Sequence, residues 1–204
     1  MDTISPERMY ISYPYITENI KKHFIRYEFA SQFTSGVCLD CACGSGYGSN
    51  ILSNKSVEVF SIDKSQEAID YAKEHNQKGN IIYTQNNIND FDFAENYFNT
   101  IVSLETIEHI SKDTVVLFFN KVKKILKYGG VFICSTPMLR MKEGEPYITS
   151  PYHINEMLKS EFLTLVDDSF PKYTKHFYHQ QDSYFVPLGI EQNGFCIVVI
   201  RKNE

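Results

Sequence analysis

An acidic residue and three glycines stand where a short apolar segment ends, in the stretch Val37–Ser49 (VCLDCACGSGYGS). Asp40 closes the apolar segment, and Gly44, Gly46 and Gly48 follow it. Glycines let the backbone turn sharply and approach a ligand closely. The turn opens into a predicted helix, whose N-terminus favours a carboxylate or a phosphate. The pattern indicates a nucleotide-type binding turn, and a purely structural turn is the alternative.

A second acid, Asp63, lies about twenty residues past the glycines at the end of the apolar segment Val57–Asp63 (VEVFSID). A carboxylate at that place can accept hydrogen bonds from both hydroxyls of a ribose. The turn and the acid together narrow the ligand to an adenosine-type cofactor. The glycines follow G-x-G-x-G and lack the third glycine of the dinucleotide fingerprint G-x-G-x-x-G, which disfavours a dinucleotide-binding oxidoreductase.

Histidines are the candidates for proton transfer, because their charge changes near neutral pH. His109 follows Glu105 and Glu108 after another apolar segment, and His153 lies in a later loop. If residues 105–109 are helical, Glu105 and His109 share one face and can pair. We take His153, His109 and Glu105 as candidate catalytic residues. The alternative is that they only order their loops.

Two further positions are candidate substrate contacts, Tyr13 and Arg26. Tyr13, with Tyr10 and Tyr15, can cover the cofactor or stack on a substrate, although simple packing is the commoner role of such residues. Arg26 lies on a predicted N-terminal helix over residues 17–34. It can bind an anionic substrate group or occupy a solvated helix face, and we slightly favour the solvated face.

We expect no required metal. Cys38, Cys41 and Cys43 sit in an apolar strand with no second Cys/His pair at zinc-site spacing, so buried reduced thiols are the better interpretation, also for Cys134 and Cys196. Four acids were weighed as cation ligands, and no spacing places them around one ion: Asp90, Asp92, Glu105 and Glu108.

Apolar strands alternate with helices along the chain, as in α/β proteins with a mostly parallel sheet covered on both faces. The expected strands are Val37–Asp40, Val57–Asp63, Ile81–Thr84, Thr100–Leu104, Val131–Ser135, Tyr173–His179 and Phe195–Arg201. After the N-terminal helix, one helix is expected to begin at the glycine turn, and further helices are expected over residues 65–74, 112–127 and 155–170. Loops are expected over residues 138–154 and 180–194. The fold class is a Rossmann-like doubly wound, seven-stranded sheet with an antiparallel last strand and an extra N-terminal helix.

The 204 residues fit one domain. Its parts are an N-terminal cap and helix (1–35), a cofactor-binding core (36–137), and a substrate-side loop with a C-terminal β-hairpin region (138–204). The net charge is −5 and no Lys/Arg block occurs, which disfavours nucleic acid as the principal partner. Neither a secretory signal nor an apolar stretch of membrane-spanning length is present. We expect a cytoplasmic monomer or homodimer.

Four segments resemble motifs of class I S-adenosylmethionine-dependent methyltransferases. LDCACGSGYGS resembles their first motif, and YTQNNINDFDF resembles their third-strand segment, with Asn87 where an acid usually stands. FNTIVSLETIEHI resembles the fourth-strand motif of the methyltransferase type 11 and ubiquinone-pathway-like group. ILKYGGVFICSTP resembles the next segment, with Tyr128 replacing a proline. HFIRYEFA (23–30) and SPYHINEM (150–157) are similar to methyltransferases found with surface-polysaccharide genes.

The resemblance implies S-adenosylmethionine as cofactor and S-adenosylhomocysteine (SAH) as its product. The resemblance assigns the methionine portion of the cofactor to Asp40, Cys43, Gly44, Ser45 and Gly46. It assigns the ribose to Asp63, the adenine to Lys64, Asn87 and Ile88, and the sulfonium region to Leu104 and Glu105. His109 and His153 would also contact the substrate. The implied reaction is O-methylation of a small molecule, first a sugar or surface-glycan precursor. A quinone-like phenol or another metabolite, methylated on oxygen or nitrogen, is the alternative, and a non-catalytic cofactor-binding module is a third.

Overall fold

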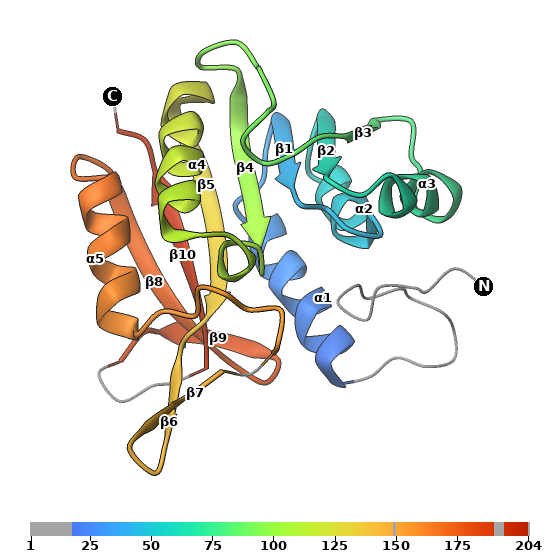
Figure 1. Cartoon of the computed structure of the whole chain (residues 1–204). Coiled ribbons are helices and arrows are strands. Elements are labelled where there is room, and N and C mark those ends of the chain that lie inside the picture. The colour runs from blue at the N-terminus through green and yellow to red at the C-terminus, as the bar shows by residue number, and fades with distance from the viewer. Residues whose placement is uncertain (1–17, 149, 190–193, 204) are drawn as a thin grey trace.

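The computed structural model describes residues 18–148, 150–189 and 194–203. These residues form an eight-stranded sheet with the strand order β3-β2-β1-β4-β5-β10-β8-β9 (Figure 1). Its strands are β1 (Val37–Cys41), β2 (Glu58–Asp63), β3 (Ile81–Gln85), β4 (Phe98–Leu104), β5 (Leu126–Pro137), β8 (Thr174–Gln181), β9 (Tyr184–Pro187) and β10 (Phe195–Arg201). The first five are parallel to one another, whereas β10 pairs antiparallel with β5 and β8, and β9 pairs antiparallel with β8.

Helices cover both faces of the sheet (Figure 1). On one face, α4 (Lys112–Ile125) and α5 (Lys159–Ser169) bury Phe118, Phe119 and Phe162 in one apolar cluster. On the other face, α1 (Glu18–Ser31), α2 (Tyr47–Ser53) and α3 (Gln66–His75) bury Tyr27, Leu52 and Ile69 in a second cluster. The near-continuous apolar character of β1, β2, β4, β5 and β10 is therefore explained, because each of these strands contributes side chains to both clusters.

The predicted fold class is confirmed, with one strand more than the seven expected. The additional strand is β9, which lies in the segment predicted as a loop and pairs with β8 at the sheet edge. It has only four residues, none of them buried, and ends at Pro187. Short edge strands that tolerate proline carry little of the alternating apolar pattern that marks an interior strand.

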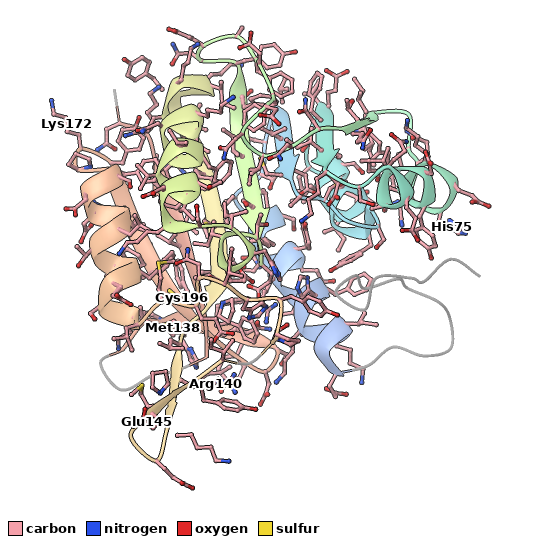
Figure 2. All side chains as sticks on the ribbon, in the orientation of Figure 1. His75, Met138, Arg140, Glu145, Lys172 and Cys196 are labelled. Atoms are coloured by element: carbon pink, nitrogen blue, oxygen red, sulfur yellow. The ribbon has the colours of Figure 1, made fainter. Side chains whose placement is uncertain are left out.

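The prediction of a loop over residues 138–154 is wrong in its first half. β6 (Arg140–Lys142) and β7 (Glu145–Tyr147) form a separate hairpin. Figure 2 labels Arg140 and Glu145 on this hairpin, which projects beyond the main sheet. Its two turn residues have positive φ, 54° at Glu143 and 89° at Gly144, as tight hairpins require. All six strand residues are exposed, so no hydrophobic alternation predicts them.

The helix expected from residue 155 begins four residues later, at Lys159 of α5. The backbone amide of Asn155 bonds to the Glu108 carbonyl oxygen at 3.0 Å instead of joining a helix. The Glu161 carboxylate accepts the Leu158 amide at 2.9 Å and fixes the start of α5. Residues 155–158 are thus held against the segment that follows β4.

Strand order reverses between β1 and β4, which lie side by side although β2 and β3 come between them in sequence. Ligands of open α/β sheets bind outside the carboxyl ends of the strands at such a reversal. The carboxyl ends of β1, β2, β3 and β4 carry most of the residues singled out from the sequence. Among the helices of the described residues, none is long and apolar enough to cross a membrane.

Candidate active site

The turn after β1 is tied to the end of β2 by the carboxylate of Asp63. Asp63 Oδ2 accepts the backbone N–H of Gly44 and Oδ1 accepts that of Ser65, both at 2.9 Å. Ser65 caps α3, as predicted, by accepting the Ala68 amide at 3.3 Å. One buried carboxylate therefore orients both the glycine turn and the first turn of α3.

The three glycines of the turn differ in what a side chain at each position would contact. A Cβ on Gly46 would lie 2.6 Å from the Ala72 Cβ, and one on Gly48 would collide with the Tyr27 ring. A Cβ on Gly44 would meet nothing within 4 Å, although φ there is +53°. Gly46 and Gly48 are thus required for packing, whereas Gly44 faces open space beside Asp63, where a ligand can lie.

Alanine at Gly44 and at Gly48 is expected to separate binding from packing. Gly48→Ala should lower the free energy of unfolding by about 3 kcal/mol, because the added methyl group overpacks the Tyr27 contact. Gly44→Ala should cost only about 1 kcal/mol of backbone strain but weaken S-adenosylmethionine binding about tenfold or more. Urea denaturation and calorimetric titration measure the two quantities, and equal destabilisation with equal affinities would contradict the assignment.

Asp40 is fully buried at the end of β1 and is held by two hydroxyls. Its Oδ2 accepts a hydrogen bond from Ser49 Oγ at 2.6 Å, and its Oδ1 accepts one from the Tyr27 hydroxyl at 3.2 Å. Burial raises the pKa of Asp40 to about 7, and the charge of Asp63 adds to the increase, while the two hydrogen bonds oppose it. Asp40 therefore changes charge near neutral pH.

Asp40→Asn is expected to change how stability depends on pH. The folded-state pKa is raised from an ordinary 3.8 to about 7, so the folded protein holds the proton more tightly than the unfolded chain. This contribution to stability is present below pH 3.8 and is lost as the pH rises through about 7. Relative to the variant, the wild type should lose on the order of 1 kcal/mol per pH unit between pH 5 and 7. A pH-independent difference would contradict the assignment.

The predicted adenine contacts lie around the end of β3. Asn87 is exposed, and its side-chain oxygen accepts the Asn89 amide at 3.2 Å. Ile88 is buried, and Lys64 is exposed just after β2. Leu104, at the end of β4, is buried. Cys43 and Ser45 are buried in the glycine turn.

The predicted helical pairing of Glu105 with His109 is wrong. Glu105 has φ of +52°, and the helical turn that follows, η1 (Ile107–His109), spans only three residues. The side chain of Glu105 turns instead to Ser135, whose hydroxyl donates to Oε1 at 2.7 Å. Its other oxygen lies 3.4 Å from the guanidinium of Arg26.

Arg26 does not occupy a solvated helix face, contrary to the favoured alternative. Only 2% of it is exposed, and its Nε donates to Gln180 Oε1 at 2.7 Å. The guanidinium carbon lies 3.7 Å from the centre of the Phe195 ring. Arg26 thus balances the charge of Glu105 inside the protein. Whether it also contacts a substrate stays a prediction.

His109 and His153 are brought together, as two candidate bases of one site should be. Their ring centroids are 4.8 Å apart. The loop that carries His153 is fixed to η1, because the amides of Ile154 and Asn155 both donate to the carbonyl oxygen of Glu108. Glu108 is buried beside them, and burial followed by the charge of Glu105 raises its pKa well above the ordinary value.

Comparisons with known proteins show what the chain is similar to. A family model described as a methyltransferase domain matches residues 39–134, from β1 into β5. A probable S-adenosylmethionine-dependent methyltransferase of Mycobacterium tuberculosis is 21% identical over 151 residues, covering 73% of this chain and 54% of its own length. The chain is therefore similar to S-adenosylmethionine-dependent methyltransferases, and its residues 39–134 match a methyltransferase domain.

Other relatives of the chain carry different names. A ubiquinone biosynthesis O-methyltransferase of Mesorhizobium japonicum is 30% identical over 125 residues, covering 60% of this chain and 49% of its own. The chain spans about half the length of these curated relatives. Two solved structures share its fold: small RNA methyltransferase HEN1 (TM-score 0.71, 19% identity, 97% of this chain and 27% of that one) and a DhpI–SAH complex (0.65, 17%, 88% and 82%).

One carboxylate borders the space where a cofactor can lie. The open space at Gly44 adjoins Asp63, which ends β2. S-Adenosylmethionine carries a ribose and two positive groups, and a carboxylate suits both. Asp40 is fully buried and Arg26 balances the charge of Glu105, so these two acids add little negative charge there. The assignment of each residue to one part of the cofactor stays a prediction.

Several residues of the candidate site were not predicted. Tyr27 and Ser49 hold Asp40, Gln180 holds Arg26, and Glu156 contacts His153. Tyr27, Ser49 and Glu156 lie in segments that resemble family motifs, although the sequence assigned no role to them, whereas Gln180 lies in none of these segments. Tyr10, Tyr13 and Tyr15 lie outside the described residues.

Proposed function

We propose that this methyltransferase transfers a methyl group to a hydroxyl of a small molecule, in first place a sugar or surface-glycan precursor. The observation that carries the proposal is the histidine pair, His109 and His153, beside the carboxyl end of β4. A hydroxyl group must lose its proton to become a good nucleophile, and a positioned base typically contributes about 10²–10⁴-fold to the rate. A neutral amine has less need of such a pair.

Bound S-adenosylmethionine would supply a methyl group on a positively charged sulfur, which is already electrophilic. The residues of the chain then contribute position and desolvation. Asp63 fixes the turn that faces the ligand, and Arg26 keeps Glu105 in place next to Leu104. The histidine pair takes up the hydroxyl proton as the oxygen bonds to the methyl carbon and the carbon–sulfur bond breaks.

A sugar acceptor is supported by the resemblance of HFIRYEFA and SPYHINEM to methyltransferases found with surface-polysaccharide genes. The second candidate, a quinone-like phenol, is supported by the similarity to ubiquinone biosynthesis O-methyltransferases. Both acceptors offer a hydroxyl. A cytoplasmic location and a monomer or homodimer remain expectations from the sequence.

The test is SAH production with a panel of nucleotide sugars, free sugars, catechols, amines and a short RNA. We expect turnover with a sugar hydroxyl and, in His153→Ala, a fall in kcat of about 10²-fold with unchanged cofactor affinity. His176→Ala is the matched control, since it removes a histidine from β8. Turnover with amines or RNA alone, or a normal kcat in His153→Ala, would contradict the proposal. If no compound of the panel led to SAH production, a binding module without catalytic activity would be favoured.

A further inference from the structure

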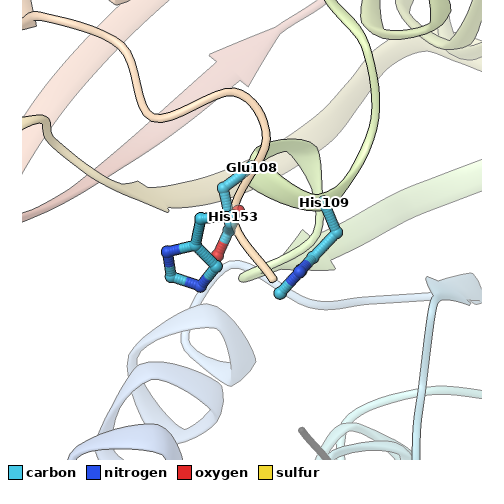
Figure 3. A group of neighbouring side chains, drawn as sticks. All are labelled: Glu108, His109 and His153. Atoms are coloured by element: carbon cyan, nitrogen blue, oxygen red, sulfur yellow. The ribbon is translucent and has the colours of Figure 1, made fainter. Parts of the chain in front are cut away.

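Three potential metal ligands converge after β4. One carboxylate oxygen of Glu108 and one ring nitrogen each of His109 and His153 lie within 4.8 Å of one another. Figure 3 shows the three side chains facing a common space, two from η1 and one from the loop that approaches it. Ligands of a tetrahedral ion with bonds of about 2.1 Å are about 3.4 Å apart, so small side-chain rotations would complete the site.

The carboxylate of Glu108 has an oxygen that the described part of the chain leaves without a hydrogen bond. Glu108 is 1% exposed, and its Oε2 accepts the Thr136 hydroxyl at 3.3 Å. Its Oε1 is buried and has no hydrogen-bond partner among the described residues. A buried polar atom in this state is costly in a folded protein, and a bound cation would satisfy it.

The two histidines are oriented as metal ligands usually are. Nδ1 of His109 lies 3.2 Å from the carbonyl oxygen of Tyr152, and Nδ1 of His153 lies 2.5 Å from Oε1 of Glu156. Both oxygens are acceptors, so each Nδ1 carries the hydrogen and each Nε2 presents a lone pair. Carboxylate and carbonyl partners of this kind fix the tautomer and direction of metal-binding imidazoles.

We propose that Glu108, His109 and His153 bind a divalent transition-metal ion, of the class of Zn²⁺, Co²⁺ or Mn²⁺. Two imidazole nitrogens and one carboxylate oxygen suit these ions, whereas Ca²⁺ and Mg²⁺ prefer oxygen ligands alone. Three protein ligands leave positions for water and for an oxygen of the acceptor. Glu105 lies outside the ligand set, because Arg26 and Ser135 hold its carboxylate.

The role of the ion rests on the proposed function, whereas its binding does not. An acceptor hydroxyl bound to the ion releases its proton to water more readily, because the positive charge stabilises the alkoxide or phenolate. The oxygen then forms its bond to the methyl carbon, and the electron pair of the broken carbon–sulfur bond stays on sulfur. With the ion bound, the histidines act as its ligands and the acceptor proton leaves to water. This replaces the uptake of that proton by the histidine pair, which applies to the ion-free protein.

The test begins with EDTA-treated, dialysed protein that is titrated with Co²⁺, Zn²⁺, Mn²⁺ and Mg²⁺. We expect one Co²⁺ ion per chain with visible absorption, tight Zn²⁺ binding by calorimetry, and much weaker binding of Mg²⁺. Glu108→Gln keeps the size of the side chain and should weaken Co²⁺ binding about 100-fold or more. Glu156→Gln should weaken it about 10–100-fold, as loss of an outer partner does. His75→Ala removes a histidine at the end of α3, which contributes no ligand to the site, and should change nothing.

The outcomes separate the two proposals. Absence of Co²⁺ binding, or equal affinity in wild type and Glu108→Gln, would overturn the metal site. Methylation of a hydroxyl that is insensitive to EDTA would overturn the role of the ion and leave the proposed function intact. Metal binding without methylation of any hydroxyl in the panel would leave the site standing and overturn the proposed function. His109→Gln is the second ligand variant, should Glu108→Gln fail to fold.

Discussion

Arg26→Met is expected to lower the free energy of unfolding by about 3–5 kcal/mol, because it leaves the carboxylate of Glu105, whose side chain is only 10% exposed, without its cation. Arg26 is almost fully buried, 3.4 Å from Glu105 and 2.7 Å from Gln180, and it packs on the Phe195 ring. Methionine retains the apolar packing and removes the charge and the hydrogen bonds. Urea denaturation followed by circular dichroism measures the loss.

Two controls isolate the charge. The double variant Arg26→Met with Glu105→Gln should recover a large part of the lost stability, because no buried charge then stays unpaired. Lys21→Met removes an exposed cation of the same helix, which pairs with Glu18 on the surface, and should leave stability unchanged. If the three variants were equally stable, the buried ion pair would have no structural role.

The positions of the acids were predictable because the sheet is parallel. Asp40, Asp63 and Glu105 each end or follow an apolar strand, and the carboxyl ends of parallel strands meet at one edge. Alternation of strands and helices is a local signal, so it indicated this edge from the sequence. The direction in which each carboxylate points was not predictable. Glu105 has a positive φ, and its side chain lies toward Arg26. A glutamate at that position gives no sign in the sequence that its φ is positive.

Contacts between segments that are distant in the sequence could not be predicted, because such contacts leave no local pattern in the sequence. Gln180 meets Arg26 across 154 residues, and neither lies in a periodic pattern that indicates the other. His109 and His153 were each singled out for their chemistry. Their meeting depends on backbone bonds from Ile154 and Asn155 to Glu108 in an irregular loop. Loops of this kind are fixed by tertiary contacts, whereas strands and helices follow periodicity.

Asp63→Ala is expected to weaken S-adenosylmethionine binding by about 10²–10⁴-fold. Charged hydrogen bonds contribute about 1.5–3 kcal/mol each, and Asp63 is predicted to make two to the ribose. It also holds the turn through the amides of Gly44 and Ser65, so its loss relaxes the surface that faces the ligand. Calorimetric titration with S-adenosylmethionine and with SAH measures the effect. Asp70→Ala, which removes an exposed acid of α3, is the matched control.

The two roles of Asp63 are separated by changing the ligand as well as the protein. In the wild type, a 2′-deoxyribose analogue of SAH should bind about tenfold more weakly than SAH, because one hydrogen bond to the carboxylate is lost. In Asp63→Ala the two ligands should bind equally, since no carboxylate discriminates between them. If the variant still preferred SAH tenfold, Asp63 would act through the turn alone, and the ribose hydroxyl would have another partner. Unchanged affinity for SAH itself would remove Asp63 from the cofactor site.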